Sequence, residues 1–394
     1  MDINEQLAKI RRGAVEIISE EELAAKLKSK KQLIIKLGVD PTSQDIHLGH
    51  TVVINKLKTF QELGHKVVFI IGDFTARIGD PSGRSETRPM LGEKEILDNA
   101  KTYQAQVFKI LDKSKTEVMF NSDWLYSLGI DGLLELTKHA TVAQMLARAD
   151  FSQRYQAGGN ISILEFIYPL LTAYDSISVN ADVELGGTDQ KFNLLMARDI
   201  QKDYGQQPQI VMTMPLLEGT DGVRKMSKSY NNYIGISEPP SEIFGKIMSV
   251  SDELMYKYYE LLTQDDLGEI KKLHPKEAKV RLAHSMVARF HYEEAAKRAG
   301  EEFNKVFASK ELPSEIEVHD LKSQDKNIRI SELMTKSGLA SSKKEAERLI
   351  LQGGVKIDGE KVALEDKVSD KFKDKKERII QVGKRKFKKI KIEG

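Results

Sequence analysis

Two histidines three residues apart stand at the predicted start of a helix, in the segment His47-Leu48-Gly49-His50. Side chains at this spacing point to about the same side of a helix. A helix start also offers free backbone N–H groups and a partial positive charge, and Gly49 lets a ligand approach the backbone closely. With Asp40-Pro41-Thr42 just before it, the segment suits binding ATP and donating hydrogen bonds to its phosphates. A zinc pair and two structural histidines are the alternatives, but the chain has no cysteine and no convincing third ligand nearby.

A second group of residues could stabilise charge on a phosphate. Two lysines flank small residues in Lys225-Met226-Ser227-Lys228-Ser229, which follows the Gly-rich acidic loop Glu218-Gly219-Thr220-Asp221-Gly222. Such a pair can act as a mobile cationic clamp on a phosphate that is being transferred. An exposed basic loop is the plainer interpretation, and the complete pentad makes it less favourable.

These residues need elements that bring them together, and the hydropathy pattern predicts two similar halves. The first half is expected as a strand, a helix and a strand, at residues 33–39, 47–64 and 67–71. The second half repeats this order at residues 183–185, 191–204 and 210–214. Two such units predict a parallel sheet and a doubly wound nucleotide-binding domain.

The order of patterns along the chain predicts three domains. They are a Rossmann-like domain at 1–235 with a helical insertion at about 88–163, an α-helical domain and linker at 236–325, and a C-terminal domain at 326–394. The insertion carries an apolar stripe that fits either an internal core or a surface for a partner, made of Ile96, Ala100, Tyr103, Val107 and Ile110. In the last domain, Asp358-Gly359 predicts the turn of a tight hairpin.

Composition fits a soluble cytoplasmic protein. Of 394 residues, 40% are hydrophobic and none is cysteine, which excludes disulfides and thiolate zinc sites. We find no secretion signal and no apolar run long enough to span a membrane. Residues 328–394 hold 19 Lys and Arg against 11 Asp and Glu, so a basic end follows an acidic body. This end suggests a polyanionic partner, although a solvated lysine-rich surface explains the charge equally well.

The two phosphate-handling segments, in this order and at this separation, resemble the signatures of class I aminoacyl-tRNA synthetases, usually written HIGH and KMSKS. The second match is complete and the first departs only at Leu48. Other segments are similar to the tyrosyl-tRNA synthetase family of the bacterial type: Leu37-Gly38-Val39-Asp40-Pro41-Thr42, Ile78-Gly79-Asp80-Pro81-Ser82-Gly83, Tyr174-Asp175 and Gly186-Gly187-Thr188-Asp189-Gln190. The resemblance covers nearly the whole chain. It implies an α/β fold with a doubly wound parallel-sheet nucleotide-binding domain and helical insertion, then an α-helical domain and a small α+β RNA-binding module.

The residues themselves agree in part with tyrosine as the substrate. Tyr168, Thr172 and Asp175 fall on one face of a helix that is otherwise apolar, and Pro169 is expected to start or kink that helix. A buried carboxylate such as Asp175 can accept the hydrogen bond of a phenol, and phenylalanine would leave it unpaired. The tyrosyl enzymes are themselves the standard example of this discrimination. The alternative is a buried polar network within the protein.

The family pattern implies a role for each matched position. The catalytic group would be Thr42, His47, His50, Lys225 and Lys228, and Arg84 or Arg88 could join the two lysines at the phosphates. The ATP-binding group would be Asp40, Gly49, Gly187, Asp189 and Lys228. The substrate-binding group would be Lys36, Gly38, Thr75, Asp80, Tyr168, Thr172, Asp175 and Gln190. ATP would enter as a substrate with Mg²⁺, and no dedicated protein metal site or permanently bound cofactor is expected.

Two positions depart from the family pattern. Many tyrosyl enzymes carry Tyr where this chain has Lys36, which could donate to the substrate hydroxyl or point elsewhere. At Thr172 the family carries Gln, which helps to hold the amino group of the substrate. A shorter side chain there leaves room for a water molecule or another side chain.

The C-terminal segment 330–362 resembles the small RNA-binding module first seen in a ribosomal protein of the small subunit. Lys343, Lys344 and Arg348 would lie along one of its helices, where clustered cations can bind an RNA backbone. The basic tail at 384–391 alternates as a strand would.

The resemblance therefore implies a tyrosine–tRNA ligase, which activates L-tyrosine with ATP and transfers it to tRNA(Tyr). It also implies a homodimer built through the helical insertion. A synthetase for a tyrosine analogue is one alternative, motivated by Thr172. An RNA-binding protein that has lost catalysis is the other, and the intact histidines and lysines speak against it.

Overall fold

The computed structural model describes residues 2–42, 44–82, 92–307, 316–322, 325–383 and 386–392. They form two compact units, which we describe separately. The first unit comprises Met1–Pro239 and Lys246–Leu282, and the second comprises Pro240–Gly245 and Ala283–Gly394. Among the described residues, no helix has the length and apolar character needed to cross a membrane.

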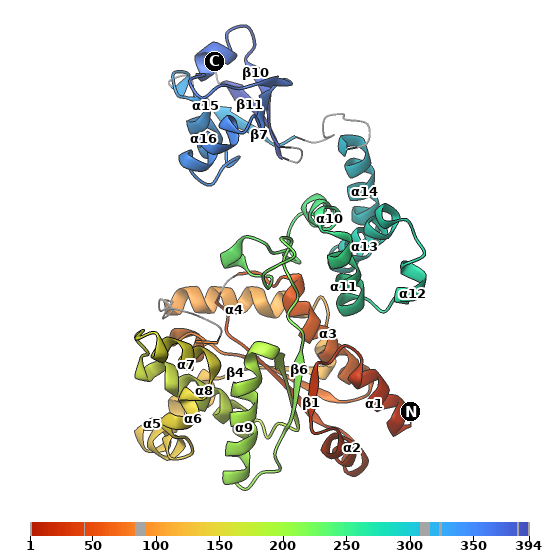
Figure 1. Cartoon of the computed structure of the whole chain (residues 1–394), viewed down its shortest axis with the longest axis vertical. Coiled ribbons are helices and arrows are strands. Elements are labelled where there is room, and N and C mark those ends of the chain that lie inside the picture. The colour runs from red at the N-terminus through yellow and green to blue at the C-terminus, as the bar shows by residue number, and fades with distance from the viewer. Residues whose placement is uncertain are drawn as a thin grey trace. The chain divides into compact units, whose positions relative to one another are not determined.

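A six-stranded sheet forms the centre of the first unit, in the order β1-β6-β5-β2-β3-β4 (Figure 1). Its strands are β1 (Glu16–Ile18), β2 (Ile34–Val39), β3 (Lys66–Ile71), β4 (Thr116–Phe120), β5 (Val183–Gly187) and β6 (Ile210–Met214). All pairings are parallel except that of β1 with β6. The central strands are almost wholly apolar, as strands covered on both faces are.

The helices that follow β2 and β5 define where a ligand can bind. The chain runs from β2 through α3 (Leu48–Glu62) to β3 on one side, and from β5 through α9 (Lys191–Asp203) to β6 on the other. Right-handed crossovers in opposite directions place the two helices on opposite faces. The carboxyl ends of β2 and β5 therefore flank the switch point of the sheet, which is the usual place for a ligand in this kind of fold. The doubly wound domain predicted from the sequence is confirmed.

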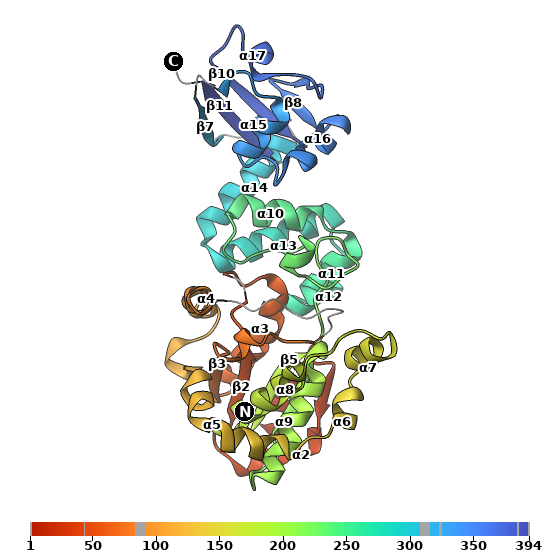
Figure 2. The same cartoon turned by 90° about the vertical axis from the view of Figure 1, so that its left-hand side faces the viewer.

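The remaining helices of the first unit cover the sheet or build the insertion, and α8 packs beside α9 (Figure 2). They are α1 (Ile3–Arg11), α2 (Glu20–Ser29), α4 (Glu93–Val107), α5 (Ser122–Thr137), α6 (Val142–Leu146), α7 (Ala149–Gln156), α8 (Ile163–Ser178), α11 (Asp252–Leu262) and α12 (Leu267–Ile270). The expected helical insertion also contains β4, which extends the main sheet by pairing with β3. Pro169 lies inside α8, whose start is instead set by a capping box of Ser162 and Glu165.

The apolar stripe of the insertion belongs to the core of the chain. All five of its side chains, from Ile96 to Ile110, are buried within the first unit. Of the two interpretations left open by the sequence, the structure selects the internal core.

The second unit contains a helical part and a small α+β module. α10 (Pro240–Ser249) and α13 (Pro275–Phe290) contribute residues to both units, and α14 (Glu293–Phe307) belongs to the second. The module has a sheet in the order β7-β11-β10-β8-β9. Its elements are β7 (Val318–Leu321), α15 (Ile330–Lys336), α16 (Lys343–Leu351), β8 (Val355–Ile357), β9 (Glu360–Lys361), α17 (Val368–Lys371), β10 (Glu377–Val382) and β11 (Lys386–Ile392).

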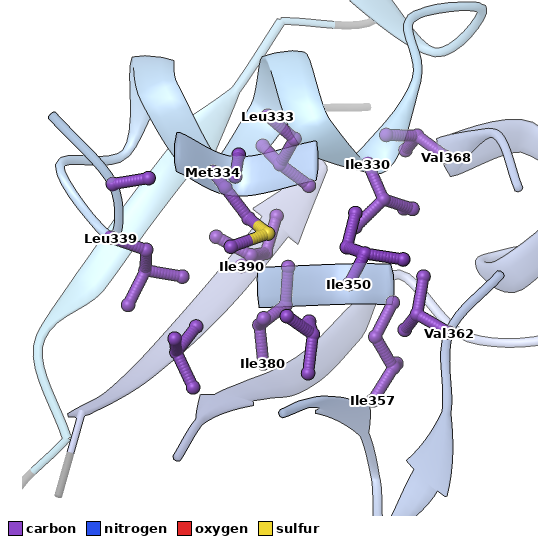
Figure 3. Close-up of a cluster of buried hydrophobic side chains, with 14 of the residues drawn as sticks. Ile330, Leu333, Met334, Leu339, Ile350, Ile357, Val362, Val368, Ile380 and Ile390 are labelled. Carbon is purple, nitrogen blue, oxygen red and sulfur yellow. The ribbon is translucent and has the colours of Figure 1, made fainter. Parts of the chain in front are cut away.

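The module has its own apolar core, in which both helices pack on one face of the sheet (Figure 3). Met334 and Ile350 come from the helices, and Ile380 and Ile390 come from the two long strands. The predicted hairpin joins β8 to β9, with positive φ angles of 47° at Asp358 and 90° at Gly359. This conformation explains the Asp-Gly pair at that turn.

Candidate active site

A cavity of about 360 Å³ opens beside the carboxyl ends of β2 and β5 in the first unit. Sixteen of the predicted site residues line it: Lys36, Gly38, Asp40, Thr42, His47, Gly49, His50, Thr75, Asp80, Tyr168, Thr172, Asp175, Gly187, Asp189, Gln190 and Lys225. They come from both halves of the sheet and from α8. Lys228 does not line the cavity itself.

The two histidines occupy the first turn of α3. His47 is the N-cap residue, and its backbone N–H donates to Nδ1 of His50 at 3.2 Å. Their rings stack with centroids 3.8 Å apart. Because Nδ1 of His50 accepts a hydrogen bond, we assign its proton to Nε2, which leaves that N–H available to a ligand. A Cβ at Gly49 would stand 3.0 Å from the His47 ring, so glycine is needed for this close packing.

Burial keeps both imidazoles neutral. It lowers the pKa of His50 to about 4, with the charge of Lys228 acting in the same direction. Burial also holds the pKa of His47 well below its ordinary value, reinforced by His50 and Lys228. Neutral rings can donate hydrogen bonds to phosphate oxygens but do not carry a proton to them. Among the described residues, no group of three or more His, Asp or Glu side chains is arranged to hold a metal ion.

The two signature lysines each face a carboxylate. Nζ of Lys225 lies 2.8 Å from Oδ2 of Asp189, and Nζ of Lys228 lies 2.9 Å from Oδ2 of Asp45. The loop that carries them is anchored by the backbone bond from the N–H of Met226 to the carbonyl of Leu217. The lysines are thus held by side chains that a more highly charged anion could replace.

Asp175 lies at the deep end of the cavity and is held by two donors from the insertion. Nε1 of Trp124 donates to its Oδ1 at 2.8 Å, and Nδ2 of Asn121 donates to its Oδ2 at 3.2 Å. Burial raises the pKa of Asp175 to about 6, against the opposing charge of Lys36. Neither Trp124 nor Asn121 can be predicted from the sequence, because they follow β4 in a segment that has no recognisable motif.

Asp40 connects Thr75 with Tyr168 of α8 through hydrogen bonds. It accepts hydrogen bonds from the hydroxyl of Thr75 at 2.7 Å and from that of Tyr168 at 3.0 Å. Burial raises the pKa of Asp40 to about 7, with Asp80 and Asp175 adding to the effect. A Cβ at Gly72 would stand 2.2 Å from Oδ1 of Asp40, so only glycine permits this approach.

Asp80 and Gln190 form a separate pair on the same cavity. Nε2 of Gln190 donates to Oδ2 of Asp80 at 2.7 Å. Asn193 supports Gln190 by donating to its Oε1 at 2.9 Å, and Arg148 of the insertion donates to Asn193. This chain of contacts fixes the orientation of the Gln190 amide.

The two positions that depart from the family pattern are both engaged within the protein. Lys36 is 1% exposed, and its Nζ lies 2.7 Å from Oε1 of Glu184. The Thr172 hydroxyl donates to the carbonyl of Pro169 at 3.0 Å, one turn back along α8. Neither polar group is directed freely into the cavity.

The predicted RNA-binding cations lie in the second unit. Lys343, Lys344 and Arg348 are exposed on α16, whose side chains Ala346 and Ile350 are buried. Lys343 pairs with Glu332 at 2.6 Å.

Some predicted residues cannot be placed. Arg84 and Arg88 lie outside the described residues, as do Lys384 and Arg385 at the start of the basic tail. The rest of that tail forms β11, so its alternating pattern does correspond to a strand.

Two family models match the chain. The model described as "tRNA synthetases class I (W and Y)" matches residues 28–308, and the S4 domain model matches residues 328–371.

Tyrosine–tRNA ligases of several bacteria are similar to this chain over nearly its whole length. Tyrosine–tRNA ligases from Francisella tularensis and Aquifex aeolicus are each 53% identical, over 98% of this chain and 98% of their own. That of Thermotoga maritima is 53% identical over 99% of this chain and 98% of its own. Among solved structures, tyrosyl-tRNA synthetase from Archaeoglobus fulgidus, in complex with L-tyrosine, has a TM-score of 0.63 at 25% identity and covers 76% of this chain and 100% of its own.

Proposed function

We propose how the cavity carries out the reaction of this chain, which belongs to the tyrosine–tRNA ligases, the tyrosyl members of the class I aminoacyl-tRNA synthetases. The chain activates L-tyrosine with ATP to tyrosyl-adenylate and then transfers tyrosine to the 3′ end of tRNA(Tyr). The observation that best supports the proposed roles is that one cavity gathers both phosphate-handling segments and Asp175.

In the first step, a carboxylate oxygen of tyrosine attacks the α-phosphorus of ATP. The bond to the bridging oxygen breaks and pyrophosphate leaves. We assign Thr42, His47 and His50 to the phosphates, as neutral hydrogen-bond donors. Lys225 and Lys228 stabilise the charge that develops on the leaving group, in exchange for their carboxylate partners Asp189 and Asp45. Mg²⁺ enters with ATP as part of that substrate.

In the second step, the terminal ribose hydroxyl of the tRNA attacks the tyrosyl carbonyl and AMP leaves. No side chain forms a covalent bond to the substrate in either step, so catalysis is positioning and charge stabilisation. The adenylate must approach the backbone closely, and it is lined by Gly38, Gly49, Gly187 and Asp189.

The amino-acid end of the cavity carries the substrate contacts. Asp175 accepts the hydrogen bond of the tyrosine hydroxyl. Asp40, Asp80, Tyr168 and Gln190 surround the ammonium and carboxylate groups, and Thr75 and Thr172 complete the wall. Two carboxyl groups, Asp40 and Asp80, near one substrate cation are chemically reasonable, because that cation lowers their mutual repulsion.

We further propose that the chain forms a homodimer through the insertion. Large apolar side chains are exposed on α5 to α8, namely Tyr126, Ile130, Leu134, Val142, Tyr155 and Ile163. An apolar surface of this kind is typical of a protein interface. The buried stripe from Ile96 to Ile110 has no part in it.

The proposed domain roles follow the sequence boundaries. Residues 1–235 carry out both chemical steps, 236–325 contact the anticodon region, and 326–394 bind the tRNA backbone. We place the reaction in the cytoplasm, where tRNA(Tyr), tyrosine and ATP are used in translation.

The test is amino-acid-dependent exchange between ATP and labelled pyrophosphate. We expect exchange with tyrosine and none with phenylalanine or tryptophan. Exchange only with a ring-substituted tyrosine would replace tyrosine by that analogue in the proposal. RNA binding without exchange for any amino acid would indicate a chain that has lost catalysis.

A further inference from the structure

Lys36 stands in the middle of the sheet beneath the amino-acid end of the cavity. It lies on β2, and its side chain is 1% exposed. The three N–H donors of its ammonium group have three acceptors within the protein. These are the Thr172 carbonyl at 3.1 Å, the Ser176 hydroxyl at 2.7 Å and Oε1 of Glu184 at 2.7 Å. No donor remains for a substrate hydroxyl.

The partner carboxylate is equally well satisfied. The Ser176 hydroxyl donates to Oε2 of Glu184 at 2.9 Å, and the Gln209 amide donates to the same oxygen. A buried ion pair of this kind costs much desolvation and adds little net stability over apolar side chains. A functional reason for it is therefore worth seeking.

The contacts of Lys36 join β2 to one face of α8. Thr172 and Ser176 lie on either side of Asp175 in that helix, so Lys36 fixes the segment from which Asp175 projects. Its positive charge also acts on Asp175 directly. After burial, it is the strongest influence on the pKa of that carboxyl, and it opposes the rise.

Asp175 is surrounded by charged and titratable groups on several elements. Lys36 acts from β2 and Glu184 from β5, in opposite directions. Asp40 and Tyr168 also interact with it, from the end of β2 and from α8. Among these groups, Lys36 carries the one positive charge.

We infer that Lys36, paired with Glu184, is a positioning residue that sets the discrimination of Asp175 between tyrosine and phenylalanine without touching the substrate. The inference rests on the proposed function of Asp175 as the acceptor for the tyrosine hydroxyl. Removing Lys36 leaves Asp175 more easily protonated, and a protonated carboxyl accepts the hydrogen bond of a phenol less strongly than a carboxylate does.

The chain offers a probe of Asp175 that does not depend on activity. Trp124 is its single tryptophan, and the indole N–H donates to Asp175. Tryptophan fluorescence followed against pH in the unliganded chain therefore reports the protonation of this carboxyl. We expect a midpoint near 6 in the wild-type chain.

The experiment combines this titration with pyrophosphate exchange for tyrosine and phenylalanine. In Lys36→Met the fluorescence midpoint should rise by about 1 pH unit or more. The ratio of kcat/KM for tyrosine to that for phenylalanine should then fall about twofold at pH 7 and about fivefold at pH 6, in step with the ionised fraction of Asp175. Glu184→Gln should lower the midpoint, and Lys36→Met/Glu184→Gln should bring it back toward the wild-type value.

Lys26→Met is the matched control. Lys26 is also a buried lysine paired with a carboxylate, Asp182, at 3.3 Å, but it does not line the cavity. This variant should lose thermal stability and keep both the midpoint and the ratio.

An unchanged midpoint in Glu184→Gln would overturn the inference, even if Lys36→Met does not fold. The inference would also be overturned if the ratio of kcat/KM for tyrosine to that for phenylalanine fell in Lys36→Met with no shift of the fluorescence midpoint. That result would indicate direct contact between Lys36 and the substrate. If the wild-type chain shows the titration but no exchange with tyrosine, the proposed function fails while the electrostatic role of Lys36 stands.

Discussion

Each signature lysine faces a carboxylate that is partly exposed, Lys225 against Asp189 and Lys228 against Asp45. Ion pairs near the surface are worth only about 0–1 kcal/mol, so little is lost when a phosphate replaces the carboxylate. The histidines differ, because His47 is buried, His50 is half-buried, and both are neutral before any ligand arrives. The site thus combines hydrogen-bond donors that are fixed on α3 with lysines that exchange a carboxylate partner for a phosphate.

Lys228→Ala tests the role of the exchangeable cations. We expect single-turnover formation of tyrosyl-adenylate to slow by about 100-fold or more, as for the loss of one charge-stabilising donor. The affinity for tyrosine should change by less than about threefold, because Lys228 is not near Asp175 in the proposed binding mode. Asp45→Ala is the control and should leave the rate within about threefold of wild type. Unchanged adenylate formation in Lys228→Ala would contradict the role.

At the scale of elements, the sequence predicts well wherever the hydropathy pattern is periodic. Both strand–helix–strand units lie within a few residues of the expected bounds, and the C-terminal hairpin turns at the expected Asp358-Gly359 pair. β4 was missed because it is short and half exposed, so its side chains show no continuous apolar run.

The partners of the site residues were harder to predict than the site residues. Glu184 reaches Lys36 from a strand 148 residues further on, and Trp124 reaches Asp175 across 51 residues. Contacts at such separations depend on packing that no local pattern encodes. The contacts of Lys36 therefore could not be predicted from the sequence.

The exposed apolar side chains of α5 give a prediction at the same scale. Ile130 and Leu134 are one turn apart, after a kink at Gly129, and are 79% and 59% exposed. Ile130→Asp/Leu134→Asp should weaken dimerisation by about 100-fold or more, because charges would be buried without partners. Light scattering coupled to size exclusion measures the mass. The control is Val15→Asp, which changes another exposed apolar residue and should remain dimeric. A monomeric wild-type chain would contradict the proposed dimer.

At the scale of the whole molecule, the proposed catalytic part and the proposed RNA-binding part carry net charges of opposite sign. The last 67 residues carry a net charge of +8, and the rest of the chain carries −6. Within the module, α16 turns its apolar side to the sheet and its cations to solvent. Lys343 already has a protein partner in Glu332, which leaves Lys344 and Arg348 as the better candidates for RNA phosphates.

Lys344→Ala/Arg348→Ala tests this division. The affinity for tRNA should fall about tenfold, and the slope of log K against log salt should become shallower by about 1 to 2, one for each phosphate contact that is lost. Pyrophosphate exchange with tyrosine should not change, because the variant leaves the cavity of the first unit intact. The control is Lys66→Ala/Lys202→Ala, which removes two exposed lysines from the acidic part of the chain. An equal loss of affinity in that control would mean that α16 has no special place in binding, and a loss of exchange in the α16 variant would mean that the two functions are not separable.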